Sequence, residues 1–375
     1  YYKILKIYSI SPLISITDMP EPLKNLYTTA LINQLASCLQ KQHPKFDSQA
    51  FISAIFNDQW ANFELKQRMQ HITLNLHQFL DVDYLQALPT LINCSRQFNG
   101  FETMFFPEYV ELFGMHEFKP SMSALEIMTQ YSSSEFAIRP FIIQQQDQSM
   151  LQMLKWSSSK NHHVRRLASE GCRPRLPWAI SLPVFKKDPS TIFPILENLK
   201  NDESEYVRRS VANNLNDISK DNPSLVFERA KSWKGQSKNT DNLIKHGCRT
   251  LLKQGQPEAL SLFGFNNPEH ITVNNFSCES SVNTGDYLDF QFNLNSSKSL
   301  GRCRIEYKIY FQKANASLSA KVFKISEADI SQNHKQIKKR HSFKMITTRK
   351  YYPGLHQLEI IVNGQAMDKK DFYLI

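Results

Sequence analysis

Apolar side chains recur at helical spacing through the first two thirds of the chain. In the segment LKNLYTTALINQLASCL, residues 23–39, they form one stripe opposite a polar face. This spacing is typical of helices that bury one face against their neighbours. The pattern continues to about Leu262, and strand-like alternation is scarce before that point. We therefore expect residues 19–265 to form one helical domain.

Three segments of this helical region resemble one another. HHVRRLASEGCRPRL, EYVRRSVANNLNDIS and NLIKHGCRTLLKQG align on Val164, Val207 and Ile244, at intervals of 43 and 37 residues (207 − 164 and 244 − 207). Periods of about 40 residues are typical of paired-helix repeats of the HEAT or armadillo kind. The sequence thus predicts an α-α superhelix, a solenoid of HEAT-like repeats.

The pattern changes after Pro268. Short segments such as DYLDFQFNLN and HQLEIIVNGQ alternate apolar and polar residues and are separated by Asn, Ser, Gly and Asp. About seven such strands predict an immunoglobulin-like β-sandwich over residues 268–375. Residues 1–18 contain Pro12 and are followed by no small-residue cleavage site, so we expect an extension outside the fold rather than a secretory signal.

Composition favours a soluble protein with a polyanionic partner. The 375 residues carry a formal net charge of +10, and a basic surface that only maintains solubility is the alternative. The six cysteines form no C-x-x-C pair, which favours reduced thiols and a cytoplasmic location. No H-E-x-x-H run and no long apolar segment occurs, so we expect no metal, no cofactor and no membrane contact.

Positive charge is concentrated in HHVRRLASEGCRPRLPWA, residues 162–179. Four arginines surround a single acid, Glu170, and the run ends at Trp178. Arg166 and Glu170 are four residues apart, so they share one face of a helix that Gly171 and Pro174 then terminate. The residues could hold an anionic polymer and present a carboxylate to it. An ordinary surface ion pair and a core tryptophan are the structural alternatives.

The segment YVRRSVANNLNDISKD, residues 206–221, predicts a helix with two stripes. One stripe is apolar, whereas the other is polar and consists of Ser210, Asn213, Asn214 and Asp217. We expect the polar stripe to face the concave groove of the solenoid, although Asp217 could be merely solvated. Glu135, in SSSEFAIRPFI, could be a helix-start acid that satisfies backbone amides.

HVRRLASEGCRPRLPWA, YVRRSVANNLNDISKDNP and EFAIRPFI closely resemble segments of the AlkC-like bacterial DNA alkylation repair glycosylases. The resemblance covers about Met19 to Leu262, and the sandwich is similar to the immunoglobulin-like domain of some members. It implies a base excision repair enzyme that acts on double-stranded DNA and removes cationic 3-methyladenine and 3-methylcytosine. It also implies that the base is not fully extruded into a pocket, as most glycosylases require.

The resemblance places function on particular residues. The catalytic set that it implies is Glu135, Glu170, Trp178 and Asp217. Carboxylates suit this reaction, because positive charge develops on the sugar as the glycosidic bond breaks. Arginines and lysines would hold the phosphates. The expected DNA-binding residues are Arg165, Arg166, Arg173, Arg175, Arg208, Arg209, Lys338, Lys339 and Arg340.

Two other functions remain open from the sequence. The main alternative is a non-catalytic HEAT-repeat scaffold that binds nucleic acid or an acidic protein. A DNA binder that has lost activity is the second. Three acids and a tryptophan among the basic residues favour the enzyme, because a scaffold has no need of acids that repel phosphate. We expect a monomer, and the sequence does not separate the two methylated bases as substrates.

Overall fold

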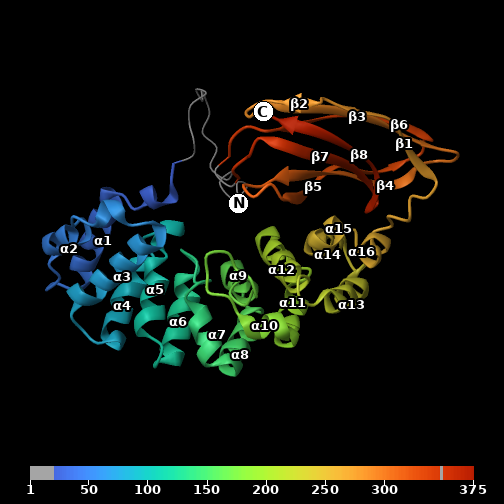
Figure 1. Ribbon diagram of the computed structural model, residues 1–375. Coiled ribbons are helices and arrows are strands. Elements are labelled where there is room, and N and C mark those ends of the chain that lie inside the picture. Colours follow the sequence, from blue (N-terminus) through green and yellow to red (C-terminus); the bar gives the residue numbers. More distant parts are fainter. Residues whose placement is uncertain (1–20, 347–348) are drawn as a thin grey trace. The chain divides into compact units, whose positions relative to one another are not determined.

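The computed structural model describes residues 21–346 and 349–375. The extension expected at residues 1–18 lies outside the described residues. The chain forms two compact units. The first contains the described residues up to Cys172 together with Leu176–Leu182, and the second contains Arg173–Arg175 and Pro183–Ile375. Helices come first and strands last, which confirms the predicted order of helical repeats followed by a β-sandwich (Figure 1).

Helices of the first unit pack mainly on their near neighbours in sequence, as in a repeat array. Thr28 begins the first of them by accepting a hydrogen bond from the N–H of Leu31 at 3.2 Å. The helices are α1 (Thr29–Gln42), α2 (Ser48–Ile55), α3 (Leu65–Leu80), α4 (Tyr84–Ser95), α5 (Phe105–Phe113), α6 (Phe118–Met128), α7 (Ile138–Gln144), α8 (Gln146–Trp156) and α9 (His162–Glu170).

Helices of the second unit continue the same style. Pro223 and Pro257 occupy first positions of helices, where a missing N–H costs nothing. The helices are α10 (Pro183–Lys187), α11 (Phe193–Leu199), α12 (Glu205–Ile218), α13 (Pro223–Trp233), α14 (Lys238–Gly247), α15 (Arg249–Lys253) and α16 (Pro257–Leu262).

The predicted repeat is visible in matching hydrogen bonds 43 residues apart. Arg165 on α9 donates through Nη1 to the carbonyls of Ser159 and Lys160, both at 3.0 Å. Arg208 on α12 donates through Nη1 to the carbonyls of Asp202 and Glu203. In both cases the acceptors lie six and five residues before the arginine, in the turn that precedes the helix. The two arginines therefore perform the same structural task in successive repeats.

Helix α12 differs from the prediction on one face. Its apolar stripe is buried as expected, but Ser210, Asn214 and Asp217 of the polar stripe are also buried. The sequence did not predict the burial of these three side chains. At Asp217 the reason is Arg173, whose guanidinium pairs with this acid and covers the end of the helix that bears it.

The β-sandwich consists of two sheets that share one apolar core (Figure 1). The strand order is β1-β3-β6 in one sheet and β2-β8-β7-β4-β5 in the other, and every pairing except β2–β8 is antiparallel. The strands are β1 (Ile271–Cys278), β2 (Ser281–Val282), β3 (Tyr287–Ser296), β4 (Gly301–Gln312), β5 (Leu318–Ile330), β6 (His334–Ser342), β7 (Gly354–Val362) and β8 (Gln365–Leu374).

The sandwich is attached to the last helices by both polar and close backbone contacts. Lys245 on α14 forms an ion pair with Glu327 on β5, and Glu327 also pairs with Arg304. Asn363 and Gly364, both at positive φ, make the tight turn between β7 and β8. A Cβ at Gly364 would lie 2.6 Å from Leu260 Cδ1 on α16. These contacts explain why α10–α16 and the sandwich form one unit.

We predict that Gly364→Ala weakens this attachment. Positive φ alone costs about 1–3 kcal/mol for a residue with a Cβ, and here the new methyl group would also displace Leu260. Gly285→Ala is the matched control, because Gly285 has φ 104° and nothing lies within 4 Å of its position. Thermal unfolding should show a larger loss for Gly364→Ala. Equal losses would mean that the contact with α16 contributes nothing.

Candidate functional site

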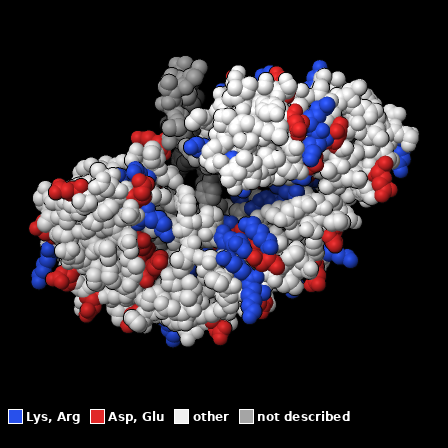
Figure 2. Space-filling model, viewed as in Figure 1, with Lys and Arg blue, Asp and Glu red and all other residues white. Residues whose placement is uncertain are grey.

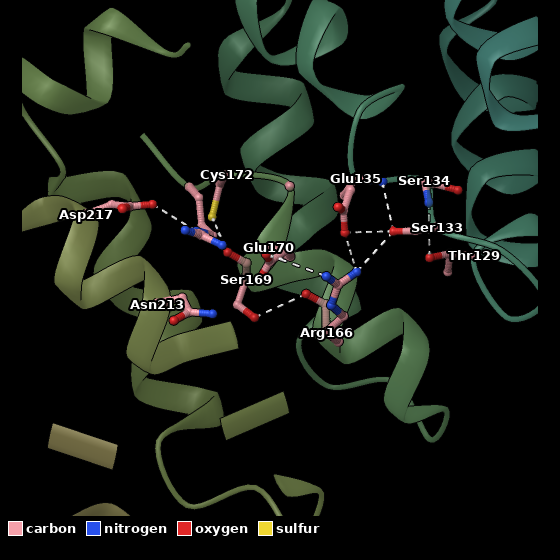
Figure 3. Close-up of polar contacts among 12 residues, drawn as sticks. Thr129, Ser133, Ser134, Glu135, Arg166, Ser169, Glu170, Cys172, Asn213 and Asp217 are labelled. Carbon is pink, nitrogen blue, oxygen red and sulfur yellow. Dashed lines mark hydrogen bonds and ion pairs between the residues drawn. The ribbon is translucent and has the colours of Figure 1, made fainter. Parts of the chain in front are cut away.

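Arg166 on α9 joins two carboxylates of the first unit (Figure 3). Its guanidinium forms ion pairs with Glu135 and, at 3.5 Å, with Glu170 one turn further along α9. The Nη1 atom also donates to Ser133 Oγ at 3.0 Å, and Ser133 Oγ donates to Glu135 Oε2 at 2.8 Å. We call Ser133, Glu135, Arg166 and Glu170 the Arg166 cluster. Two of the predicted catalytic acids thus lie in one site.

The Arg166 cluster is not an ordinary surface ion pair. The side chains of Glu135, Arg166 and Glu170 are only 14%, 15% and 7% exposed. With both acids ionised, the cluster carries one net negative charge in a poorly solvated place, where charge acts more strongly than in water. The arrangement can therefore stabilise a positive charge brought close to it.

Trp178 lies in a strained turn of the same unit. The N–H of Ala179 donates to the carbonyl of Leu176 at 3.3 Å, with Pro177 and Trp178 at the centre of the turn. Trp178 has φ 65°, where a bulky residue costs about 1–3 kcal/mol. The residue is 49% exposed, and its ring packs edge-on against Phe101, with ring centroids 6.0 Å apart. The alternative of a core tryptophan is therefore wrong.

Asp217, the third predicted acid, lies in the second unit. Its Oδ2 pairs with Arg173 Nε at 2.8 Å, and its Oδ1 pairs with Lys220 Nζ at 3.0 Å. The Asp217 side chain is only 3% exposed, so the solvated-residue interpretation is also wrong. Two cations on one acid leave a net positive charge, opposite in sign to that of the Arg166 cluster.

The predicted DNA-binding cations have different environments. Arg165 is buried on backbone carbonyls, and Arg208 makes the equivalent contacts. Arg175 pairs with Asp221 at 2.6 Å and Arg209 with Glu205 at 2.8 Å. Figure 2 shows Lys and Arg side chains gathered over α12, with acidic side chains beside them. In the sandwich, Arg340 pairs with Asp289 at 2.9 Å, and Lys338 and Lys339 are exposed on β6.

Several polar residues near the site were not found from the sequence. Ser133 is uncharged and lies outside the motif EFAIRPFI, but its hydroxyl group connects Arg166 to Glu135. Lys66 on α3 donates to the carbonyl of Trp178 at 3.0 Å, over a separation of 112 residues that no local pattern spans. Glu108 and Glu111 on α5 line a small concavity together with Ser133 and Phe136. Burial raises the pKa of each of these two acids to about 7.

The described residues contain neither a candidate metal site nor a candidate membrane span. Between residues 21 and 375, leaving out 347 and 348, no group of three or more His, Cys, Asp or Glu is placed to hold a metal ion. Over the same residues, no helix combines the length and hydropathy needed to cross a membrane.

Comparison with known proteins identifies relatives that span almost the whole chain. The family model described as "DNA alkylation repair enzyme" matches residues 129–247, and that of "Uncharacterised protein YhaZ, C-terminal Ig-like domain" matches residues 272–375. The uncharacterized protein YhaZ of Bacillus subtilis is 45% identical over 352 residues, which is 93% of this chain and 98% of the relative.

A solved structure matches both parts of the chain together. It is the alkylpurine DNA glycosylase AlkC of Pseudomonas fluorescens, bound to DNA containing an abasic site analog. The match has a TM-score of 0.91 and 34% identity, and it covers 95% of this chain and all of that one. Helical repeats followed by an immunoglobulin-like domain thus define a DNA alkylation repair protein. The chain belongs to the AlkC-like family of DNA alkylation repair glycosylases.

The raised pKa values on α5 lead to a prediction about pH. Because the pKa of Glu111 rises from its usual 4.5 to about 7 on folding, the unfolded chain loses this proton at lower pH than the folded protein. The carboxyl group therefore destabilises the fold increasingly as pH rises from 4.5 to 7, and at a constant level above that range. We expect Glu111→Gln to raise the melting temperature at pH 8 but not at pH 4.

A matched control is available on α13. Glu228 is exposed, so Glu228→Gln should leave the melting temperature almost unchanged at both pH values. If Glu111→Gln behaved like this control at pH 8, the folded protein would not bury an ionised Glu111.

Proposed function

We propose that this protein is a DNA glycosylase of base excision repair that hydrolyses the N-glycosidic bond of cationic N3-methylated bases. The expected substrates are 3-methyladenine and 3-methylcytosine in double-stranded DNA. The observation that carries this proposal is the Arg166 cluster, in which Glu135 and Glu170 share one arginine. Membership of the AlkC-like family and the alkylpurine glycosylase activity of the relative from P. fluorescens support it.

The chemistry follows from where charge develops. A methylated cationic base is already a good leaving group, so the barrier is the positive charge that appears on deoxyribose as the bond breaks. Glu135 and Glu170 stabilise that charge, because the Arg166 cluster keeps a net negative charge in a low-dielectric place. One of the two acids also orients the attacking water. Arg166 reduces their mutual repulsion and fixes their geometry before DNA arrives.

Trp178 and Asp217 complete the proposed catalytic set. The exposed indole of Trp178 offers a π face to a cationic sugar or base. Asp217 is held by Arg173 and Lys220, and the side chain of Lys220 is 39% exposed. A DNA phosphate that attracts Lys220 would free one oxygen of Asp217, so phosphate binding and exposure of this acid would occur together.

The proposed DNA-binding cations fall into groups according to their partners within the protein. Arg175 and Arg209 are in ion pairs near the surface, which a phosphate can replace at low cost. Lys338 and Lys339 are exposed on the sandwich and add a contact with the DNA backbone to those of the helical part. Arg165 and Arg208 hold turns of their own chain, so their contribution to binding is indirect.

The direct test is incubation with methylated duplex DNA and detection of the released bases by mass spectrometry. Release of 3-methyladenine or 3-methylcytosine, leaving abasic sites, is the expected result. Tight binding of DNA without release of any base would instead support the non-catalytic scaffold.

We predict that Glu170→Gln separates chemistry from binding. The single-turnover excision rate should fall by about 10²–10³-fold, because the amide cannot stabilise positive charge. The affinity for DNA should stay equal or rise, since a negative charge near the phosphates is lost. Glu228→Gln on α13 serves as the control and should match the unmodified protein. A normal rate for Glu170→Gln would remove Glu170 from the catalytic set.

A further inference from the structure

The segment between Gly171 and Ile180 connects two parts of the proposed active site. It begins immediately after Glu170, the last residue of α9, and it contains the turn that carries Trp178. The segment has no regular secondary structure. The relative position of the Glu170 carboxylate and the Trp178 indole therefore depends on the contacts that hold this segment in place.

Arg139 on α7 holds both ends of the segment. The side chain is fully buried, its Nε donates to the carbonyl of Ile180 at 2.6 Å, and its Nη1 donates to the carbonyl of Gly171 at 2.8 Å. A buried charge is costly unless it is well hydrogen-bonded. The two hydrogen bonds to carbonyls offset part of the cost of burying the Arg139 guanidinium. A planar guanidinium can reach two carbonyls at once in a fixed geometry.

Close packing at Gly171 fixes the same end independently. A Cβ at this position would lie 2.6 Å from Ile138 Cγ2, on the residue next to Arg139. Only a glycine allows the end of α9 to approach α7 this closely. The backbone next to Glu170 is therefore fixed to α7 by the hydrogen bond at Gly171 and by close packing of that glycine.

Lys66 on α3 holds the middle of the segment. Its Nζ donates to the carbonyl of Trp178 at 3.0 Å and lies 4.9 Å from the centroid of the Phe136 ring. The positive φ of Trp178 persists only if the surroundings enforce it. Lys66 and the Phe101 ring provide that constraint from outside the segment.

We propose that Arg139 and Lys66 are positioning residues. They hold the segment 171–180 so that the distance and orientation between the Glu170 carboxylate and the Trp178 indole stay fixed during base excision. Neither residue contacts the substrate in this proposal, which rests on the proposed glycosylase function. Enzymatic rates are sensitive to displacements of about 1 Å in such groups. Loss of either tether therefore lowers the rate of the chemical step more than the affinity for DNA.

The test uses the full chain in a Trp60→Phe background. The four tryptophans are Trp60, Trp156, Trp178 and Trp233, and both Trp156 and Trp233 are only 1% exposed. Quenching of fluorescence by acrylamide then reports on Trp178. The variants are Arg139→Lys, which can reach one carbonyl but not both, and Lys66→Met, which changes an exposed side chain and which we expect to fold normally.

Arg68→Lys is the matched control. Arg68 also donates from Nε and Nη1 to two backbone carbonyls, those of Phe63 and Lys24, but it does not contact the segment. Single-turnover excision is measured with enzyme in saturating excess over methylated DNA. Under these conditions a partly unfolded preparation loses active enzyme but keeps its rate constant, so general destabilisation does not imitate a positioning defect.

We expect Arg139→Lys to lower the single-turnover rate by about 10- to 100-fold and to change the quenching of Trp178, with DNA affinity within about twofold. Lys66→Met should give a smaller change in the same direction, and Arg68→Lys none. Normal rates and quenching in Lys66→Met, or a loss in Arg68→Lys as large as in Arg139→Lys, would overturn the proposal. If the unmodified protein released no base at all, the proposed function would fail, while the quenching measurement would still test the tethers.

Discussion

The backbone carbonyls at the turns between helices are the constraint on which the helical part depends. A repeat array of short helices has many such turns, and each carbonyl that is removed from water needs a donor. Arginine side chains supply these donors at Arg68, Arg139, Arg165 and Arg208, each with bonds to two carbonyls. The guanidinium group suits this task because its donors are fixed in one plane.

Because some arginines bind backbone carbonyls, the net charge of +10 does not measure the charge that faces a polyanionic partner. Part of the positive charge is engaged in hydrogen bonds to turns of the chain itself. Arg165 and Arg166 show the contrast, because adjacent residues of a helix point about 100° apart. Arg165 faces the preceding turn, whereas Arg166 faces Glu135 and Glu170. The same residue type thus holds a turn of the backbone at one position and pairs with two carboxylates at the next.

The sequence was most informative where the interactions are local. The apolar stripe of α12 and the shared face of Arg166 and Glu170 both depend on residues a few positions apart. Asp217 was recognised by resemblance, but its burial was not anticipated. Its partner Arg173 lies 44 residues away, and only the packed structure brings the two together.

The sequence by itself determined the order of helical repeats and β-sandwich, because hydrophobic periodicity records which face of each element is buried. It also determined the family, since the motifs around Glu135, Glu170 and Asp217 are long. Only the tertiary structure decided that Ser133 joins Arg166 to Glu135, that Trp178 is exposed in a strained turn, and that Arg139 and Lys66 hold that turn. The physical reason is that these contacts join residues far apart in the chain, and no local pattern records which distant side chain will satisfy a given carbonyl or carboxylate.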